Sequence, residues 1–276
     1  MNLSGGRARG RPKSFHDKTE SATIQSLDRA LKVLSVVAAG NGMSLTEVAA
    51  TGRQSTATCY RILTTFKKHH IVEFDDHTQL WHIGAEAFRI GSSFLRRTRI
   101  VDQSRQVMER LMIKTGETVN LAIIDRHEIT FIGQIETHEP IRAFFRLGTR
   151  SPVHASGIGK AIMAFQSEVL NTEILKKLSL EKFTANTIID SEALANELRI
   201  TYQRGWAIDD EEKALGMRCI AAPIFNQNGE AVAGISVSGP TVRMTQDRDN
   251  HFGRLVRTGA DEITISMGGR LQHSTS

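Results

Sequence analysis

Residues 54–69 constrain the fold more than any other segment, because the two faces of a helix formed by them differ in composition. One stripe at helical spacing is apolar and consists of Cys59, Ile62, Leu63 and Phe66. The opposite stripe is polar and basic and consists of Gln54, Ala57, Arg61, Thr64 and Lys68. An ordinary surface helix shows this pattern, and so does a helix that reads DNA with small and basic side chains. The neighbouring segments decide between these two interpretations.

Two further helices are predicted before this segment. Residues 24–39 carry apolar side chains three and four positions apart, which predicts an amphipathic helix that packs through Ile24, Leu27, Leu31, Leu34 and Val37. Ser44 and Glu47 match a capping box, which predicts a short second helix as far as Thr51. Gly52 breaks that helix, and the turn of about three or four residues that follows is the connection expected of a helix-turn-helix.

A β-hairpin is predicted directly after the third helix. Residues 71–74 and 79–83 alternate apolar and polar side chains on either side of a polar turn at residues 75–78. A hairpin in this place is a wing. Three helices and a wing in this order are far more specific than any one helix, and they indicate a winged helix-turn-helix domain over residues 23–84 that binds double-stranded DNA.

The distribution of charge agrees with a nucleic-acid partner for the N-terminal part. Residues 1–99 hold 15 Lys or Arg against 8 Asp or Glu, a balance of +7, and residues 100–276 hold 20 against 22, a balance of −2. A basic N-terminal part joined to a near-neutral remainder suggests that only the former meets a polyanion.

Residues 1–22 are rich in Gly, Ser and charge, and we expect a disordered basic arm. Within it, residues 9–13 (RGRPK) resemble the core of an AT-hook, whose extended backbone enters the narrow minor groove of A·T-rich DNA. Arg9 and Arg11 are therefore candidate minor-groove contacts, and a generic solvated tail is the alternative.

Composition excludes several classes of protein. The chain has 276 residues, enough for two domains, and no apolar run approaches the roughly 20 residues of a membrane-spanning helix. The basic N-terminus has no apolar signal core behind it, so we expect a cytoplasmic protein with no membrane partner. Cys59 and Cys219 lie far apart and have no CxxC or His-rich neighbours, so neither a disulfide framework nor a zinc site is indicated.

The remainder of the chain is predicted to be an α+β domain preceded by a linker helix. The linker helix covers residues 85–100, and the second domain covers residues 101–270. Its β-rich runs are residues 119–124, 129–135, 219–225 and 231–238, the last two flanking the Asn228–Gly229 turn. Its helix-like stretches are residues 101–114, 160–166, 168–178 and 191–204. This pattern predicts a central antiparallel sheet with helices packed on it.

In their order along the chain, these features resemble the IclR family of bacterial transcription regulators from about Ile24 to Arg248. The most specific motifs are residues 147–161 (LGTRSPVHASGIGKA), Gly205–Trp206, Asp209 and residues 236–240 (SVSGP). The resemblance implies a winged helix-turn-helix, a linker helix and a GAF-like effector-binding domain. It also implies a homodimer or dimer of dimers on a palindromic operator.

Within the family, the chain is most similar to the glyoxylate-responsive repressors of allantoin use. This nearer resemblance rests on residues 116–120 (GETVN), 132–136 (IGQIE), 219–221 (CIA), and Asp209 with Glu211 and Glu212. The chain departs from the family at the start of the third helix, where Ser55 and Ala57–Thr58 stand in place of the usual Pro and Ser-Thr. Ser55 can still cap the helix. The operator sequence therefore does not carry over from relatives.

Candidate DNA contacts follow from the exposed face of the third helix. Phosphate contacts are expected from Ser55, Thr56, Tyr60 and basic residues such as Lys68, and base-edge contacts from Gln54, Thr58 and Arg61. Arg61 can donate both of its terminal amino groups to a guanine. The alternative for Arg61 is a structural ion pair with the second helix.

A candidate ligand site is expected in the second domain. The turn at residues 157–159 (GIG) opens a helix, whose free amides and dipole favour an anion, although tight helix packing explains the glycines equally well. Ser236 and Ser238 share one face of a strand, with Cys219 on the adjacent strand. Such small polar groups suit an oxo acid of two or three carbons. By resemblance, the effector is glyoxylate, with no cofactor, held by Gly157, Ile158, Asp209, Cys219, Ser236 and Ser238. Apolar walls from Leu215, Met217 and Ile220 are a further expectation, with core packing as the alternative.

Three rival functions remain at this point. An enzyme could use Cys219 or Ser156 as nucleophile with His154 as base, but residues 234–238 (GISVS) lack the final Gly of a nucleophile elbow, and no paired carboxylates, metal spacing or phosphate loop appears. We therefore predict that the protein is not an enzyme. The effector could be another small carboxylate such as pyruvate. A DNA-bending protein that senses no ligand is the third alternative.

Overall fold

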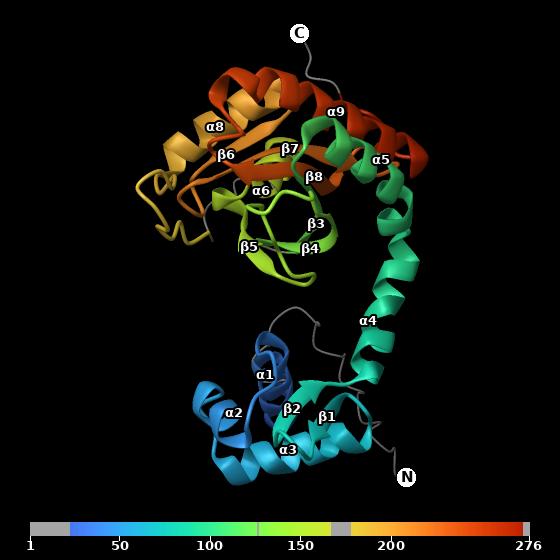
Figure 1. The fold of residues 1–276 in the computed structure, drawn as a ribbon, viewed down its shortest axis with the longest axis vertical. Coiled ribbons are helices and arrows are strands. Elements are labelled where there is room, and N and C mark those ends of the chain that lie inside the picture. The colour runs from blue at the N-terminus through green and yellow to red at the C-terminus, as the bar shows by residue number, and fades with distance from the viewer. Residues whose placement is uncertain (1–22, 126, 167–177, 273–276) are drawn as a thin grey trace, which may run out of the picture. The chain divides into compact units, whose positions relative to one another are not determined.

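A computed structural model of the chain describes residues 23–125, 127–166 and 178–272. The polypeptide divides into two compact units between Phe94 and Leu95. Figure 1 shows the elements of both. The predicted contacts from Arg9 and Arg11 lie outside the described residues.

The N-terminal unit contains the three predicted helices followed by the predicted hairpin. The elements are α1 (Gln25–Ala39), α2 (Leu45–Thr51), α3 (Thr56–Lys68), β1 (Val72–Asp75) and β2 (Leu80–Ile83). The strands β1 and β2 pair antiparallel, and Asp75 accepts the amide of His77 in the turn between them (2.8 Å). One small core joins all these elements, made of Val33, Val37, Val48, Ala49, Cys59, Leu63, Val72 and Trp81. The winged helix-turn-helix prediction is confirmed.

Local signals in the sequence place the starts of α2 and α3. The Glu47 amide donates to Ser44 Oγ (3.3 Å), and the Ser44 amide donates to Glu47 Oε2 (2.8 Å), which is the predicted capping box. At α3, the Ser55 hydroxyl accepts the amide of Thr58 (3.2 Å). Ser55 therefore caps the helix, as predicted, in the absence of the usual proline.

The turn between α2 and α3 differs from expectation in one respect. Gly52 keeps a right-handed helical backbone (φ −76°), and the left-handed residue is Arg53 (φ 50°). The turn is closed by Gln54 N–H, which donates to the carbonyl of Ala49 (3.0 Å). A left-handed backbone favours glycine, so the arginine holds a strained position beside the start of α3.

The packing face predicted for α1 is wrong in its first half. Ile24, Leu27 and Leu31 are 66%, 53% and 53% exposed, whereas Val33 and Val37 are fully buried. The buried side chains of the helix lie in its C-terminal half, where Val33 and Val37 are one turn apart. Periodicity alone identified an apolar stripe but not the part of the helix that reaches the core.

One residue with a non-helical backbone separates the predicted linker helix from the next helix. The linker helix is α4 (Ala85–Thr98), and α5 (Ile100–Thr115) follows after Arg99, whose φ is 50°. Ile100, predicted as the last linker residue, is instead the first residue of α5 and is buried in the core of the C-terminal unit.

The C-terminal unit is built on one six-stranded antiparallel sheet of order β5-β4-β3-β8-β7-β6. The strands are β3 (Thr118–Asp125), β4 (Glu128–Ile135), β5 (Arg150–Pro152), β6 (Ala207–Asp210), β7 (Met217–Phe225) and β8 (Ala231–Pro240). The predicted α+β fold with a central antiparallel sheet is confirmed. The two edge strands, β5 and β6, were not predicted, because they are short and carry little apolar alternation.

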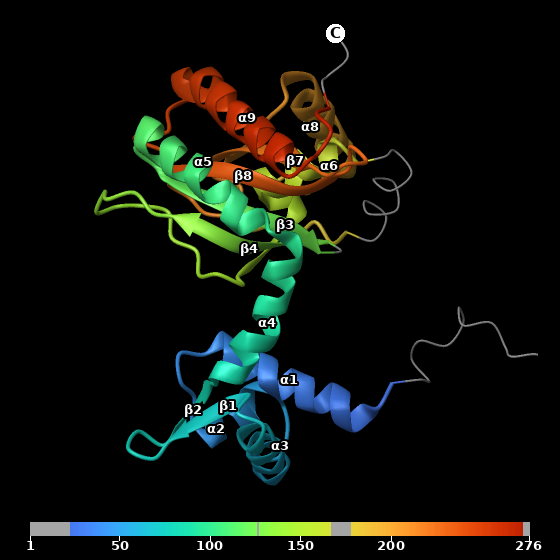
Figure 2. The same ribbon diagram turned by 90° about the vertical axis from the view of Figure 1, so that its right-hand side faces the viewer.

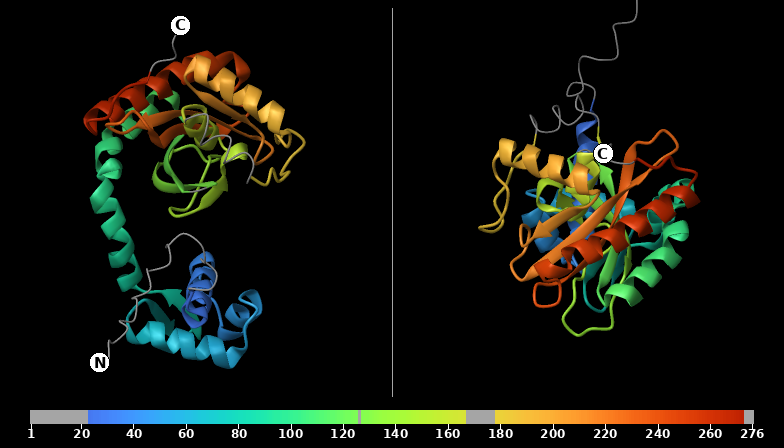
Figure 3. Two further views of the ribbon diagram at one scale, coloured as in Figure 1. Left: turned by 180° about the vertical axis from the view of Figure 1, so that it is seen from behind. Right: turned by 90° about the horizontal axis from the view of Figure 1, so that it is seen from above.

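Helices cover both faces of this sheet (Figure 2). On one face lie α5 and α9 (Asp249–Ser266), and on the other lie α6 (Gly157–Ala164) and α8 (Ser191–Arg204), as the view from above also shows (Figure 3). Short 3₁₀ turns at Val153–Ala155 and Gln246–Arg248 precede α6 and α9. The helix α9 was not predicted, α6 begins three residues before its predicted start, and nearly all of the predicted helix at 168–178 lies outside the described residues.

Alternation along β8 assigns side chains to the two faces. Ile235 and Val237 join the core formed with α5 and α9. Ser236 and Ser238 therefore face the side of α6, as a period of two requires. No helix in the described part of the chain has both the length and the hydropathy that a membrane span requires.

Candidate nucleic-acid interface and ligand pocket

The exposed face of α3 carries the residues predicted to contact DNA. Cys59 and Leu63 are fully buried beneath it. Its surface presents Gln54, Ser55, Thr56, Thr58, Tyr60, Arg61 and Lys68, of which Gln54 and Thr58 are partly covered. No acidic residue lies in the first turn of α3, and Lys67 and Lys68 lie in its last turn. The face is therefore cationic, and the dipole of the helix start is not neutralised.

Arg61 does not form the structural ion pair considered as its alternative role. The Glu47 carboxylate on α2 is held by the amide and hydroxyl of Ser44 (both 2.8 Å). Within the described residues, no carboxylate lies within ion-pair distance of Arg61. Its guanidinium borders a shallow groove between α1 and α3 together with Arg29. Among the described residues, neither arginine forms an ion pair, so both guanidiniums can meet an external anion.

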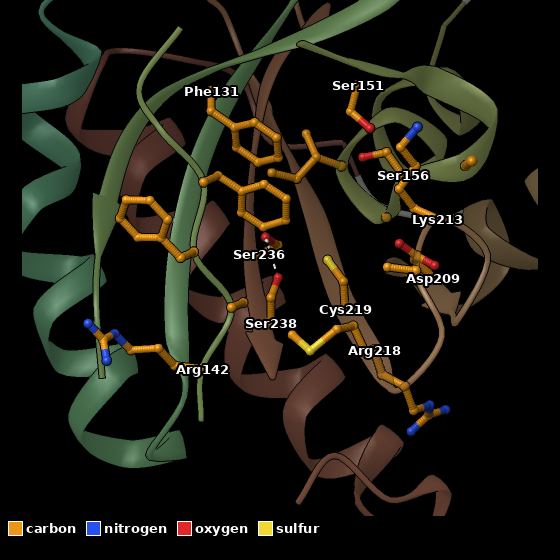
Figure 4. A pocket seen from close by; sticks show the side chains of 18 residues that line it. Phe131, Arg142, Ser151, Ser156, Asp209, Lys213, Arg218, Cys219, Ser236 and Ser238 are labelled. Atoms are coloured by element: carbon orange, nitrogen blue, oxygen red, sulfur yellow. Dashed lines mark hydrogen bonds between the residues drawn. The ribbon is translucent and has the colours of Figure 1, made fainter. Parts of the chain in front are cut away.

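A cavity of about 260 Å³ opens on the α6 face of the large sheet (Figure 4). Strands β6, β7 and β8 form its floor, the start of α6 one side, and residues 142–145 another side. All six residues predicted to bind the ligand line this cavity, namely Gly157, Ile158, Asp209, Cys219, Ser236 and Ser238. Three distant stretches of sequence are thus brought together by the strand order.

Polar side chains of the floor form a row across three strands. Cys219 on β7 pairs with Asp209 on β6 and with Ser238 on β8, so the three residues stand side by side. Ser236 is two residues from Ser238, and their hydroxyls are 3.5 Å apart. Beside them on β3, Asn120 pairs with Ser236, and its side chain donates to Ser238 Oγ (3.1 Å). Asn120 is fully buried and fixes the serine hydroxyls towards the cavity.

The start of α6 supplies main-chain donors to the same cavity. Ser156 caps the helix by accepting the amide of Gly159 (3.3 Å), and no described residue accepts the amides of Gly157 and Ile158. A Cβ atom at Gly157 would lie 2.9 Å from Cys219 Sγ. Gly157 is therefore required for the close approach of α6 to β7, and the resulting pair of amides at the start of α6 has the arrangement that favours an anion.

Aromatic rings and basic side chains complete the walls, and sequence reasoning did not identify them. Phe131 and Phe145 stack with their ring centres 4.4 Å apart. Lys213 lines the cavity with its ammonium 3.2 Å from the centre of the Phe183 ring, and burial lowers its pKa. Two arginines also line the cavity, but each is paired with a carboxylate: Arg142 with Glu136, and Arg218 with Asp210 and Asp249.

A buried ion pair lies beside the cavity, on the α6 side of the sheet. Lys160 of α6 is 1% exposed and pairs with Glu212, and Glu197 lies 3.9 Å from the same ammonium. Burial raises the pKa of Glu212 to about 7. Asp209 accepts the amide of Glu212 (2.8 Å), and burial raises its pKa also. Lys160 was missed because its neighbours in the sequence indicate only a glycine turn and a helix.

The predicted apolar walls are right for one residue of three. Met217 lines the cavity. Leu215 is 71% exposed and Ile220 is fully buried in the core beneath the opposite face of the sheet. Ile220 follows Cys219 on β7, so its side chain must point away from the cavity.

Two protein-family models match the chain and together account for both units. Residues 26–76 match the IclR helix-turn-helix domain, and residues 92–265 match the bacterial transcriptional regulator IclR C-terminal domain. The chain belongs to the IclR family. The predicted regulator class is thereby confirmed, and the enzyme alternative is excluded, because the matched families and relatives are transcription regulators.

Individual relatives agree with this assignment over nearly the whole chain. The HTH-type transcriptional regulator BhcR of Paracoccus denitrificans is 45% identical over 265 residues, 96% of this chain and 95% of that protein. The HTH-type transcriptional repressor AllR of Escherichia coli is 33% identical, covering 95% and 97%. The crystal structure of the Thermotoga maritima IclR superposes with a TM-score of 0.72 at 30% identity, covering 88% and 99%. The protein is a DNA-binding transcription regulator with a C-terminal effector domain.

Proposed function

We propose that this IclR-family regulator changes its affinity for a palindromic operator when a small 2-oxo acid, glyoxylate, binds the cavity of its C-terminal unit. The observation that carries the proposal is that one cavity is lined both by the main-chain amides of Gly157 and Ile158, which no described residue accepts, and by a floor of small polar side chains. The amides suit a carboxylate, and the hydroxyls of Ser236 and Ser238 suit an adjacent carbonyl or hydrated aldehyde. The motifs in residues 116–120 and 132–136 that resemble the glyoxylate-responsive repressors of allantoin use support the same ligand, whereas overall identity is higher to BhcR (45%) than to AllR (33%).

The size of the cavity favours a second candidate as well. Its volume of about 260 Å³ is many times the roughly 30 Å³ share of one water molecule. Glyoxylate would leave room for ordered waters or for a longer acid. The stacked rings of Phe131 and Phe145 offer such an acid an apolar wall. Pyruvate or a larger monocarboxylate is therefore the alternative effector, held through the same amides.

On the DNA side, α3 enters the major groove. Arg61, Gln54 and Thr58 meet base edges, and the phosphate contacts come from Ser55, Thr56, Tyr60 and Lys68. Arg9 and Arg11 follow the adjacent minor groove. One such helix reads only a few base pairs, so two copies in a homodimer, or a dimer of dimers, are needed for a specific site. The effector acts by binding one arrangement of these copies more tightly than another.

Calorimetry with glyoxylate, pyruvate and glycolate tests the ligand, and a duplex selected from a random library by the full chain supplies the operator. We expect heat with at least one oxo acid, and a shift in operator affinity at saturating acid. The paired Ser236→Ala and Ser238→Ala variants should lose the heat while keeping operator binding. The exposed variant Ser93→Ala, on α4, is the control and should keep both. Heat from none of the acids would reject the ligand, and the absence of both heat and any effect of the acids on operator binding would indicate a non-sensing DNA-bending protein.

A further inference from the structure

A buried cluster of charges drawn from several elements lies beside the cavity. Lys160 on α6 pairs with Glu212, and its ammonium lies 3.9 Å from Glu197 on α8. Glu197 in turn accepts Arg204 at 2.8 Å. Asp209 on β6 joins the cluster through the amide of Glu212, which it accepts at 2.8 Å. The side chains of Lys160 and Glu212 are 1% and 7% exposed, so bulk water does not screen them.

Carboxylates outnumber cations in this cluster. Two cations, Lys160 and Arg204, face three carboxylates, Glu197, Glu212 and Asp209. When all are ionised, one negative charge is left over. Asp209 is the carboxylate that, among the described residues, has no cation within ion-pair distance, and it is also the one that lines the cavity.

The other charged groups around Asp209 do not supply the missing cation. Asp210 and Arg218 pair with each other (2.7 Å), and Arg218 also holds Asp249. The Lys213 ammonium rests on the Phe183 ring, where Asp209 and Glu181 act on it only at longer range. Cys219 presents a thiol, whose pKa burial raises to about 11, and His154 is a buried imidazole whose pKa burial lowers. Both are uncharged near neutral pH.

An anionic ligand that enters this cavity adds a second negative charge beside Asp209. Like charges at such short range in a poorly screened site repel strongly, and the usual outcome is that one of the acids stays protonated. Resting on the proposed function, we propose that the cavity takes up its anionic effector together with one proton, which the Asp209–Glu212 pair holds. A protonated Asp209 donates a hydrogen bond to the ligand instead of repelling it.

Two properties of the pair suit this role. Burial raises the pKa of both carboxyls, that of Glu212 to about 7, so a proton is available to them near neutral pH. In addition, Glu212 Oε2 is buried and has no hydrogen-bond partner in the described part of the chain. A second acceptor left open in this way can take the proton without breaking an existing contact. The negative charge of Asp209, which accepts the Glu212 amide, adds to burial in raising the pKa of Glu212.

Calorimetry in several buffers measures the proton directly. The full chain is titrated with glyoxylate at pH 8, above the pKa of about 7 that Glu212 has in the free protein, in phosphate, HEPES and Tris, whose heats of ionisation differ. The slope of the observed enthalpy against the buffer's ionisation enthalpy gives the number of protons taken up, and we expect a value approaching about one. The affinity should also fall as pH rises, by up to about tenfold per pH unit above the pKa of the pair.

Two variants assign the proton, and a third is the control. Asp209→Asn and Glu212→Gln should each lower the proton slope and flatten the pH dependence of affinity. Glu192→Gln, which removes a carboxylate at an exposed position in the first turn of α8, should keep the wild-type slope. Circular dichroism and operator binding verify that each variant is folded.

The outcomes separate this inference from the function on which it rests. Heat from glyoxylate with a zero slope in all buffers would overturn the proton and leave the effector in place. If Asp209→Asn and Glu212→Gln both took up as many protons as the wild type, the assignment of the proton to this pair would be overturned. If neither glyoxylate nor pyruvate gave binding heat, the proposed effector would be rejected, and the coupled uptake of a proton with it.

Discussion

Gly157 lies so close to Cys219 that a Cβ atom on the glycine would be 2.9 Å from the cysteine sulfur. The contact joins the start of α6 to β7, and it brings main-chain donors and the polar floor to opposite sides of one cavity. Cys219 belongs to the row that β6, β7 and β8 form with Asp209 and Ser238. The distance between helix and sheet therefore sets the size of the candidate ligand site.

A methyl group at this point should impair the effector response without impairing DNA binding. In Gly157→Ala, α6 must move from β7 by a few tenths of an ångström or more, which misplaces the two free amides. We expect glyoxylate affinity to fall at least about tenfold, a loss of roughly 1.4 kcal/mol. Calorimetry and operator binding without ligand measure the two effects. Gly91→Ala on exposed α4, where a Cβ meets nothing within 4 Å, is the matched control.

Arg61 should discriminate between DNA sequences. Replacing Arg61 by Ala is expected to reduce the preference for operator over scrambled duplex by about 1–3 kcal/mol. The reason is that the two hydrogen bonds from the guanidinium to one guanine are lost. Lys68→Ala should lower the affinity for both duplexes equally, because a phosphate contact does not depend on the base sequence. Fluorescence anisotropy with both duplexes measures the difference. An equal loss on both duplexes in Arg61→Ala would assign Arg61 to the phosphates.

Arg53 should be exchangeable for glycine with a gain in stability. Its left-handed backbone (φ 50°) disfavours any side chain with a Cβ, so Arg53→Gly is expected to stabilise the N-terminal unit by about 1 kcal/mol. Urea unfolding in a Trp206→Phe background reports on this unit, since Trp81 is then the sole indole of the chain. Arg53→Ala removes the same side chain but keeps the strain, and it should show no gain. Equal stability of the two variants would contradict the role of strain.

The raised pKa of Glu212 predicts how stability depends on pH. The carboxyl has a pKa of about 7 in the folded protein against 4.5 for the ordinary group, so the folded state binds more protons between these values. Its contribution to stability is therefore greatest below pH 4.5 and declines as pH rises towards 7, by about 3 kcal/mol in all. Glu212→Gln cannot ionise, so its stability relative to wild type should rise over this window. Unfolding curves from pH 4.5 to 8 measure it, and a difference that is constant with pH would contradict the prediction.

The N-terminal unit was predictable because its signals are local. The reciprocal bonds of Ser44 and Glu47, and the cap at Ser55, follow from spacings of three residues. The wing follows from alternation on either side of a polar turn. The error on α1 arose because Ile24, Leu27 and Leu31 are as periodic as buried residues, and periodicity does not reveal whether another element lies opposite them.

The candidate ligand site was predictable only in part, for a physical reason. Gly157, Ser236 and Ser238 stand in motifs that a resemblance can identify. By contrast, Phe131, Phe145 and Lys213 reach the cavity through sheet order and through contacts between residues far apart in sequence, and Lys160 reaches the buried ion pair beside it in the same way. The edge strand β6, which carries Asp209, has only four residues, too few for alternation to reveal it. Helix α9 contains Gly253 and Gly259, which weaken a helical pattern although each fits closely against Trp206 or Leu111.

The cavity combines a main-chain surface at the start of α6 with a floor of side chains on β7 and β8. Mutation can change the floor residues one at a time, whereas the two amides persist through almost any substitution. On the proposed function, lineages of such regulators could exchange one metabolic signal for another by a few changes at positions such as Ser236 and Ser238. Their hold on the acid group, and the DNA site that they read, would stay the same throughout.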